Sequence, residues 1–392
     1  MQYRHQVQEV ALAKKLTILI LVDWFAPGFR AGGPIQSTVN IAFALKDKYT
    51  IKVLTTDTDF GEENPYPGIP ANQWTQEMDQ EIKIYYAQKK GLNSRQIRNL
   101  IVESQADFVY LNHLFSPLFV VYPLWLKWTG KIKGKIVICP RGALTQSALS
   151  VKRFKKIPLL ILLRMTGIAK RVRFHATNEV EKTAIEERFP NSEVIVANNL
   201  PSTRQLPFTD LEKKPGFLKA IFIARIHPIK NLAFLLDLLK HVKQSIMLTI
   251  VGPLEEKDYW EECEKLISGL PQNIKANYQG AIPPHELPAQ LHQHHLYILP
   301  TSGENFGHSI FEAFLAGRPV LISDQTPWLN LYEQNIGWDL PLNEMFGFVN
   351  AIETAAAWNQ HDFTAHASAS WQFAKNFIAH DSVSSQYQKL FS

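Results

Sequence analysis

Two carboxylates flank a glycine in the segment 301–320, at a point where an expected strand gives way to an expected helix. The segment reads Thr-Ser-Gly-Glu-Asn-Phe-Gly-His-Ser-Ile-Phe-Glu-Ala-Phe-Leu-Ala-Gly-Arg-Pro-Val. The apolar run Leu296–Leu299 predicts a buried strand, and Gly317 is a typical helix stop. Glu304 falls in the turn and Glu312 in the second turn of the helix. Free N–H groups at a helix start attract anions, so this turn suits a phosphorylated ligand rich in hydroxyl groups.

A carboxylate pair is also what glycoside hydrolysis requires. Here one carboxylate lies in a loop and the other inside a helix, and a hydrolase has no use for the phosphate pocket between them. Glu312 could instead be a solvated helix residue, but Phe311 and Phe314 beside it predict partial burial. Gly307, at the helix start, allows the backbone to approach a ligand closely.

Two further turns could hold phosphate. Arg225-Ile-His-Pro-Ile-Lys230 follows the expected strand Ala220–Ala224, and its two cations can reach one diphosphate. Taken alone, such a segment is more often a solvated basic turn. The loop Gly28-Phe-Arg-Ala-Gly-Gly-Pro34 follows the first expected strand and either offers N–H groups to a phosphate or forms only a tight turn. It lacks the G-x-G-x-x-G dinucleotide fingerprint.

The histidines and cysteines limit which other kinds of site the chain can form. His113 follows the expected strand Phe108–Leu111, where it could touch a substrate or serve the structure. No acidic residue adjoins the cluster His292-Gln-His-His295, so we expect no metal site there. The chain has only two cysteines, which can build neither a disulfide framework nor a zinc ribbon, so a reducing compartment is expected.

Short apolar runs alternate with amphipathic helical patterns along the 392 residues, which predicts parallel sheets covered by helices on both faces. A polar segment with prolines, 198–216, separates two such series. We therefore expect an α/β protein with two doubly wound Rossmann-like domains that face each other across a cleft. Ligands bind such sheets beyond the carboxyl ends of the strands, and each motif above follows an expected strand.

The charge is unevenly distributed. The segment 108–178 has no Asp or Glu and thirteen Lys and Arg, whereas the remainder has 28 basic and 36 acidic residues. Within it, Val151–Met165 mixes basic and aliphatic residues, and Pro117–Trp128 adds aromatic ones. This pattern indicates either contact with an anionic membrane or a core helix with a charged flank. Nucleic acid is not expected, because the apolar residues are not spaced as stacking platforms.

The first apolar run, Leu16–Val22, is short and closes on Asp23, so we interpret it as a core strand and expect no export segment. No run approaches the roughly 20 apolar residues that a transmembrane helix needs. We expect a soluble protein, or one attached to a membrane from one side.

Taken in order, the motifs resemble the family-4 retaining glycosyltransferases, which have the GT-B fold. The matching features are Gly32-Gly33, Cys139-Pro-Arg-Gly-Ala-Leu144, Arg225-x4-Lys230 and Glu304-x7-Glu312, with Thr326-Pro-Trp328 and Ile336-Gly-Trp338 downstream. The resemblance runs from about Leu16 to Trp371. It departs at Ala224 and at Asn198-Asn199-Leu200, where the family often has glycine.

The resemblance implies roles for individual residues. Arg225 and Lys230 would bind the donor diphosphate, Glu304 the donor sugar and Glu312 the ribose, and His113 would lie near the transferred sugar. The expected donor-binding set is Gly32, Gly33, Phe306, Gly307, His308, Ser309 and Glu312. The expected divisions are 1–198 for an acceptor-side domain, 199–216 for a linker, 217–370 for a donor-binding domain, and 371–392 for helices that pack back on the first domain.

The activity so implied is transfer of a sugar, with retention, from a UDP- or GDP-type nucleotide sugar, without a metal or other cofactor. The expected acceptor is lipid-linked or an oligosaccharide, in bacterial cell-surface polysaccharide biosynthesis. The expected location is cytoplasmic, on the inner face of the cell membrane, with 108–178 against the anionic surface. Two alternatives stay open: a sugar-nucleotide epimerase of the same fold, and a non-catalytic sugar-nucleotide-binding subunit. The latter should have lost a phosphate or carboxylate position, and all are present.

Overall fold

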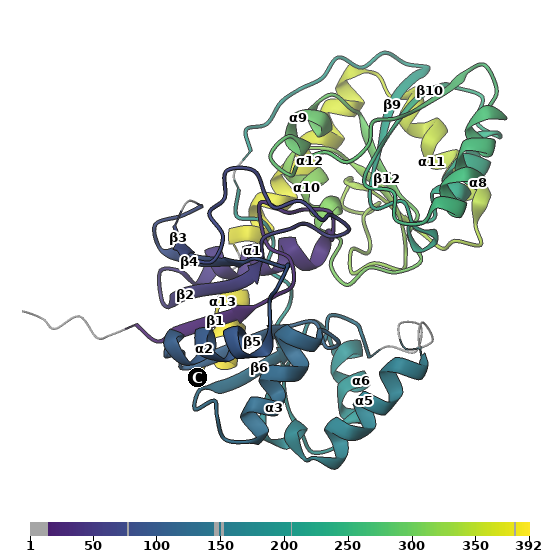
Figure 1. Cartoon of the computed structure of the whole chain (residues 1–392). Helices are drawn as coiled ribbons and strands as arrows, with labels where there is room; N and C mark the ends of the chain where they lie inside the picture. The colour runs from purple at the N-terminus through teal and green to yellow at the C-terminus, as the bar shows by residue number, and fades with distance from the viewer. Residues whose placement is uncertain (1–14, 77, 145–148, 150–152, 205, 380–381) are drawn as a thin grey trace, which may run out of the picture.

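The computed structural model describes residues 15–392 except 77, 145–148, 150–152, 205 and 380–381. It contains two separate sheets, one from each half of the chain, each with helices on both faces (Figure 1). The expected fold class, two Rossmann-like domains, is confirmed. The expected alternation of apolar runs and helical patterns therefore corresponds to real βα units.

The sheet of the first domain has the strand order β3-β4-β2-β1-β5-β6-β7-β8. All neighbours pair in parallel except β3, which runs antiparallel to β4. The strand order reverses between β1 and β5, so the crevice of this sheet lies between these two strands. The strands are β1 (Thr17–Leu21), β2 (Thr50–Thr56), β3 (Trp74–Thr75), β4 (Ile82–Ala87), β5 (Phe108–Asn112), β6 (Lys135–Cys139), β7 (Arg173–Ala176) and β8 (Glu193–Val196).

Two apolar clusters cover the two faces of this sheet. One contains residues of α1 (Gly33–Leu45) and of the last helix, α13 (Ser382–Leu390). The other contains residues of the remaining helices of the domain. These are α2 (Ser94–Ser104), η1 (Pro117–Val121), α3 (Tyr122–Trp128), α5 (Arg153–Met165), η2 (Ile168–Arg171) and α6 (Glu179–Arg188). The aromatic segment Pro117–Trp128 is helical but is divided into η1 and α3, because Pro123 has no N–H to continue the hydrogen-bond ladder.

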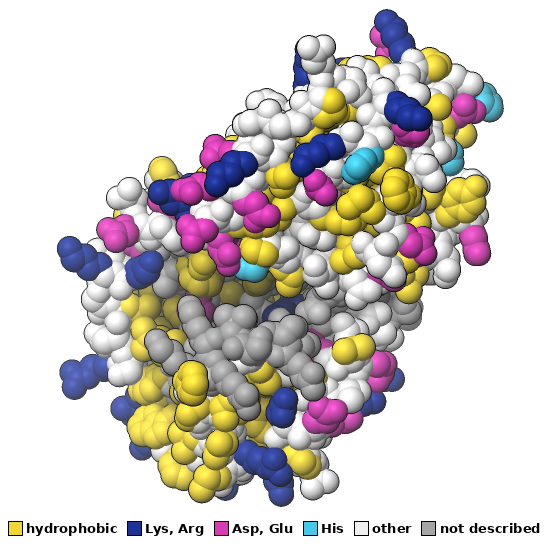
Figure 2. All heavy atoms as spheres, turned by 90° about the vertical axis from the view of Figure 1, so that its right-hand side faces the viewer, with side chains coloured by type: hydrophobic (Ala, Val, Ile, Leu, Met, Phe, Trp, Pro, Cys, Tyr) yellow, Lys and Arg dark blue, Asp and Glu magenta, His cyan; other side chains and the backbone are white. Residues whose placement is uncertain are grey.

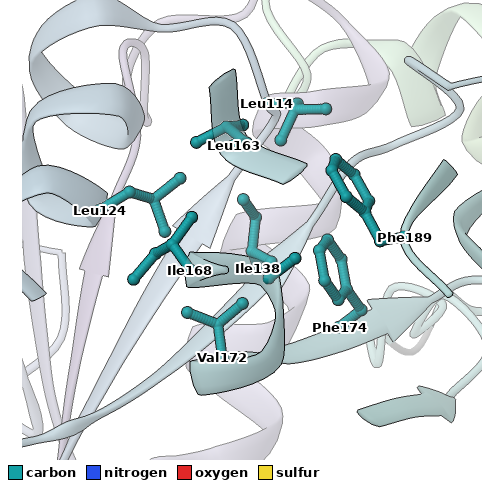
Figure 3. A pocket seen from close by; sticks show the side chains of 9 residues that line it. Leu114, Leu124, Ile138, Leu163, Ile168, Val172, Phe174 and Phe189 are labelled. Carbon is teal, nitrogen blue, oxygen red and sulfur yellow. The ribbon is translucent and has the colours of Figure 1, made fainter. Parts of the chain in front are cut away.

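A small apolar cavity of about 10 Å³ remains beneath α5 and η2 (Figure 3). Its lining is entirely hydrophobic: Leu114, Leu124, Ile138, Leu163, Ile168, Ala169, Val172, Phe174 and Phe189. The volume corresponds to about one water molecule, and no polar side chain lines it. The cavity is a gap in core packing and not a ligand site.

The sheet of the second domain is entirely parallel, in the order β11-β10-β9-β12-β13-β14. Its strands are β9 (Phe217–Ile223), β10 (Ser245–Val251), β11 (Ile274–Tyr278), β12 (Leu296–Leu299), β13 (Val320–Ser323) and β14 (Gly337–Leu340). Its helices are η3 (Pro228–Lys230), α7 (Leu232–Leu239), α8 (Lys257–Ser268), α9 (Leu287–His292), α10 (His308–Leu315), α11 (Met345–Ala357) and α12 (Gln360–Ala379).

The C-terminal segment is shared between the domains. Residues 371–379 continue α12 and pack on the second domain, where Phe373 and Phe377 contact Trp328. Beyond it, the chain crosses to the first domain, where Tyr387 and Phe391 lie in the apolar cluster with α1. Of the segment 371–392, only the part from α13 onward therefore packs against the first domain. Within the described residues, no helix is both long and apolar enough to span a bilayer.

Candidate active site

The turn between β12 and α10 is held between two other strand-end loops. The Ser302 N–H and the Thr301 hydroxyl both donate to the Ile229 carbonyl oxygen, at 2.8 and 3.0 Å. The Glu304 N–H donates to the Gln325 carbonyl oxygen at 3.0 Å. These bonds fix the turn against the loop after β9 on one side and the loop after β13 on the other. All three hydrogen bonds join loops that follow strands, at the edge where open parallel sheets bind ligands.

This clamp brings Lys230 and Glu304 together. The Lys230 Nζ lies 2.5 Å from the Glu304 Oε1, and their side chains are only 13% and 17% exposed. Two residues separated by 74 positions in the sequence thus meet at one point. Each neutralises the other, so a phosphate that binds here would have to compete with Glu304 for the ammonium group.

Arg225 is paired in the same way with Glu255, a residue that the motif search missed. A β-bridge between Ile226 and Leu254 aligns the loop after β10 with the loop after β9 and so directs Glu255 toward the guanidinium group. Glu255 follows the strand β10 closely. A search of all strand ends, and not only of glycine-rich ones, could have identified it.

The start of α10 is open. Gly307 precedes it with φ 75°, and no side chain caps the first N–H groups. A Cβ atom at this position would lie 2.6 Å from the Ile310 Cδ1, so both the conformation and the space require glycine. The Phe306 ring is buried among His308, Phe311 and Trp328 and anchors the turn to the core. Unpaired N–H groups at such a start bind anions.

The glycine loop of the first domain faces this helix start across the cleft. An added Cβ at Gly32 would lie 3.7 Å from the Arg225 side chain, and one at Gly33 would lie 3.9 Å from the His308 ring. The Ser37 hydroxyl lies 2.7 Å from the His308 Nε2, which links the two domains directly. Burial lowers the pKa of His308 to about 3, so the imidazole in this contact is neutral. The sequence-predicted phosphate loops therefore lie opposite each other.

Glu312 and Ser309 lie further along α10. Burial raises the pKa of Glu312 to about 7, although the positive charge of Arg204 opposes the shift. The Ser309 Oγ shares a hydrogen bond of 2.8 Å with the Tyr297 hydroxyl. Arg204, in the linker, is a second residue near the site that sequence reasoning missed, because nothing in its local sequence marks it.

His113 lies on the first domain, immediately beyond β5, with φ 76°. Burial lowers its pKa, and the nearby positive charges of Lys156 and Arg141 lower it further. The backbone strain at a non-glycine residue is typical of functional positions. Among the described residues, no hydrogen bond or ion pair joins His113 to the second domain.

Arg141, of the Pro-Arg-Gly segment, ties the crevice of the first domain to the linker. Its guanidinium donates to the Asn112 Oδ1 at 2.9 Å, to the Tyr110 hydroxyl at 3.1 Å and to the Asn199 side chain. The Asn199 that stands where the family often has glycine is therefore a hydrogen-bond acceptor. Beside it, an added Cβ at Gly142 would lie 3.1 Å from the Asn305 side chain of the second domain.

The histidine cluster before β12 serves the structure. The His294 ring bridges the Gln290 carbonyl and the Thr249 hydroxyl, and the His295 ring bridges the Lys219 N–H and the Glu212 carbonyl. Across the described part of the chain, no group of three or more His, Cys, Asp or Glu residues could hold a metal ion.

Comparison with known proteins places the fold. Residues 204–337, which contain Arg225, Lys230, Glu304 and Glu312, match the family described as glycosyl transferases group 1. No curated protein matches the chain. The Anabaena protein HepE, solved with UDP and glucose, is 17% identical with a TM-score of 0.65, over 96% of this chain and 98% of that one. Sucrose-phosphate synthase from Thermosynechococcus elongatus is 14% identical with a TM-score of 0.66, over 96% and 98%.

A third solved structure is that of WaaG, a glycosyltransferase involved in lipopolysaccharide biosynthesis. It is 12% identical with a TM-score of 0.56, over 96% of this chain and 98% of that one. At such identities the likeness establishes the fold and not the substrate.

Proposed function

We propose that this chain, which belongs to the group 1 glycosyltransferases with the GT-B fold, is a retaining hexosyltransferase that uses a UDP- or GDP-type nucleotide sugar. One observation carries the proposal. The Lys230–Glu304 pair, Arg225, the open start of α10 and the Gly32-Gly33 loop all converge on one cleft. Together these groups direct positive charge and free N–H groups at one point, and a carboxylate lies beside that point.

In the proposed donor complex, Arg225 and Lys230 bind the diphosphate, assisted by the Gly33 amide and by the N–H groups at Gly307–His308. When Lys230 turns to the phosphate, Glu304 is released to accept hydrogen bonds from the sugar hydroxyls. Glu312 accepts hydrogen bonds from the ribose hydroxyls. Negative charge builds on the departing diphosphate in the transition state, and fixed cations and dipoles stabilise it there.

These groups supply the charge that a metal ion would otherwise supply, so we propose that turnover requires no metal. The matching experiment compares turnover in excess EDTA with turnover in Mg²⁺. Equal rates are expected, and a rate that depends on Mg²⁺ would contradict this part of the proposal. We assign no general base, because the departing phosphate can accept the proton of the acceptor hydroxyl.

The proposed acceptor is lipid-linked or a growing glycan, in bacterial surface polysaccharide assembly. Its support is the surface of the first domain. On α5, Phe154, Ile161, Leu162 and Met165 are 94, 52, 57 and 80% exposed, and Trp125 and Trp128 of α3 are 51 and 46% exposed. Both helices contact η2, so these side chains belong to neighbouring elements. Figure 2 shows hydrophobic side chains gathered beside Lys and Arg at this end of the molecule.

A surface hollow of about 250 Å³ beside α5 is lined by Arg164, Lys170 and Asn191, with Phe189 and Pro190. Exposed apolar side chains next to cations are what a protein needs to bind an anionic membrane from one side. We therefore propose peripheral attachment to the inner face of the cell membrane. Of the residues that the sequence indicated for this contact, Lys152 lies outside the described residues.

The likeness to HepE, solved with UDP-glucose as well as with UDP and glucose, supports a nucleotide-sugar donor. The test incubates the protein with a panel of UDP-, GDP- and ADP-sugars and measures nucleotide release with and without a lipid extract. Release that requires lipid, together with labelled lipid product, is the expected result. Release of nucleotide and isomerised sugar without lipid would instead identify an epimerase, and tight binding without turnover a non-catalytic subunit.

The membrane contact is tested by flotation with vesicles that contain phosphatidylglycerol. The double substitution Phe154→Ser and Met165→Ser should reduce the floated fraction several-fold, because about 25 cal/mol is lost per Å² of apolar surface no longer buried. The matched control is Val180→Ser on α6, because the Val180 side chain is apolar and exposed as well, at 73%. Equal flotation of the double variant and the control would overturn the membrane proposal.

A further inference from the structure

The crevice of the first sheet contains a carboxylate to which no role has been assigned. The strand order reverses between β1 and β5; Asp23 is the second residue after β1, and His113 directly follows β5. Because the helices that follow such strands lie on opposite faces, a crevice opens at this point and ligands bind there in open α/β sheets. Asp23 and His113 therefore stand on its two sides.

Asp23 retains hydrogen-bonding capacity. Its Oδ1 accepts a hydrogen bond of 2.7 Å from the Ser116 hydroxyl, which is the only side chain that donates to it among the described residues. An ionised carboxylate can accept about four hydrogen bonds. In the part of the chain that the structure describes, no ion pair reaches Asp23, and burial raises its pKa. The side chain is only partly buried and so remains accessible.

Lys156 of α5 lies at the rim of the same crevice. Its Nζ lies 5.3 Å from the centre of the Phe115 ring, and Phe115 in turn contacts the His113 ring edge-on at 6.2 Å. The positive charge of Lys156 is close enough to lower the pKa of His113. A cation therefore lies beside Phe115, and the adjacent Ser116 donates to the Asp23 carboxylate.

The crevice faces the proposed donor site. On one side, the loop after β1 reaches Arg225 through Gly32. On the other, the loop after β6 reaches Asn305 through Gly142. Since β5 lies between β1 and β6 in the sheet, the crevice lies between these two contacts. A group held there would lie opposite the turn that carries Glu304.

We propose that the crevice bounded by Asp23, Ser116, His113 and Lys156 binds the head group of the acceptor, and that this head group is a sugar phosphate. Asp23 accepts a hydrogen bond from an acceptor hydroxyl and orients it, and Lys156 binds the phosphate. The inference rests on the proposed function and adds the chemical class of the acceptor. The same helix exposes Phe154 and Met165, so a lipid chain attached to the phosphate would have to pass around α5 to reach these apolar side chains.

The transfer step balances without a base from the protein. A bond forms between the acceptor oxygen and the anomeric carbon as the bond from that carbon to the diphosphate breaks. The acceptor proton passes to the departing phosphate, and Asp23 neither gives nor takes a proton. Asp23 is thus a substrate-binding residue and not an acid or base.

The experiment measures binding of soluble probes with the donor site saturated by UDP. The probes are the 1-phosphates of glucose, galactose, mannose and N-acetylglucosamine, the corresponding free sugars, and inorganic phosphate. The variants are Asp23→Asn, which preserves shape and can still receive the Ser116 hydrogen bond, and Lys156→Gln. Lys131→Gln, an exposed residue of the same basic segment that lies between α3 and β6, is the matched control.

At least one sugar 1-phosphate should bind to the wild type. Asp23→Asn and Lys156→Gln should each weaken it about tenfold, and Lys131→Gln should leave it unchanged. Binding of the free sugar should depend on Asp23 alone, and binding of phosphate on Lys156 alone. If no sugar phosphate binds, or if Asp23→Asn and Lys156→Gln behave like the control, the inference is wrong.

The UDP affinity of each variant separates this inference from the proposed function. Intact UDP binding with no probe site would refute the acceptor crevice alone, whereas a wild type that binds no nucleotide would refute the proposed function itself. A dodecyl ester of the bound sugar phosphate distinguishes lipid-linked from soluble acceptors. A gain in affinity that Phe154→Ser abolishes indicates a lipid-linked acceptor, and no gain indicates a soluble sugar phosphate.

Discussion

At the scale of residues, the cleft is organised by charge pairs that a ligand must rearrange. Lys230 and Arg225 are both held by carboxylates, and one of these, Glu304, is itself proposed to bind the donor sugar. Such an arrangement keeps buried charges compensated before the ligand arrives. It also means that each cation has two roles, one in the free protein and one in the complex.

Replacing either cation should slow transfer strongly. We expect Arg225→Ala or Lys230→Ala to cost about 2–4 kcal/mol of transition-state stabilisation, as for other groups that stabilise developing charge. The measurement is kcat at saturating donor. Lys275→Ala, on the exposed side of β11, is the matched control. Turnover of Arg225→Ala close to that of the control would remove Arg225 from the diphosphate site.

Glu312 should make stability depend on pH. Its pKa is raised from 4.5 when unfolded to about 7 when folded. The unfolded chain therefore loses this proton first, and stability falls as the pH rises from about 4.5 to about 7. Glu312→Gln removes this effect. Its free energy of unfolding, relative to wild type, should rise by on the order of 3 kcal/mol between pH 4.5 and pH 8.

Urea unfolding at the two pH values measures this difference, with the exposed Glu333→Gln as control. A difference that does not vary with pH would show that Glu312 is ionised freely in the folded protein. UDP binding by Glu312→Gln should be weaker at pH 8, because an amide oxygen accepts hydrogen bonds from ribose hydroxyls less strongly than a carboxylate does.

At the scale of elements, the linker is anchored through one buried lysine. The Lys213 Nζ donates to the carbonyl oxygens of Lys214, Ala356 and Trp358, at 3.0, 2.8 and 3.0 Å. Two of these carbonyls lie at the end of α11, so the lysine caps that helix. The linker therefore leaves the second domain from a fixed position.

Lys213→Met should destabilise the second domain by about 2–3 kcal/mol, because two buried carbonyl groups lose their donor. Denaturant unfolding measures the loss. The neighbouring Lys214→Met is the control, since that side chain is 75% exposed. Equal stability of the two variants would show that water or another donor replaces the ammonium group.

A strand could be predicted from the sequence where its own residues form a continuous apolar run. β12 was expected with the bounds it has, because Leu296-Tyr-Ile-Leu299 is a continuous apolar run and is buried on both faces. β14 was missed, since Gly337-Trp-Asp-Leu340 has no such run and becomes a strand only by pairing with β13. The two-residue β3 was missed for the same reason.

At the scale of the whole molecule, side chains of the described residues join the two domains beside the proposed donor site. The Ser37–His308 hydrogen bond and the close approaches of Gly32 to Arg225 and of Gly142 to Asn305 lie on the cleft itself. On the other side, the linker and the crossing from α12 to α13 join the domains covalently. Because these contacts lie so close to the proposed donor site, we expect the relative position of the domains to respond to the donor.

Ser37→Ala should open the cleft. The lost hydrogen bond is worth about 0.5–1.5 kcal/mol, so affinity for the nucleotide sugar should fall roughly threefold to tenfold. Small-angle scattering of the free protein should show a larger radius of gyration. Gln36→Ala, on the same helix, serves as the control. Unchanged scattering and affinity would mean that the hydrogen bond does not hold the domains together.

The sequence by itself determined the fold class and placed the candidate site residues at the carboxyl ends of the strands. Hydrophobic periodicity and strand-end motifs are local properties of the chain, so they can be recognised from the sequence alone. Tertiary structure decided which charges meet. That Lys230 pairs with Glu304, that Glu255 holds Arg225 and that Ser116 donates to Asp23 depends on chain segments far apart in sequence, which only packing brings within a few ångströms.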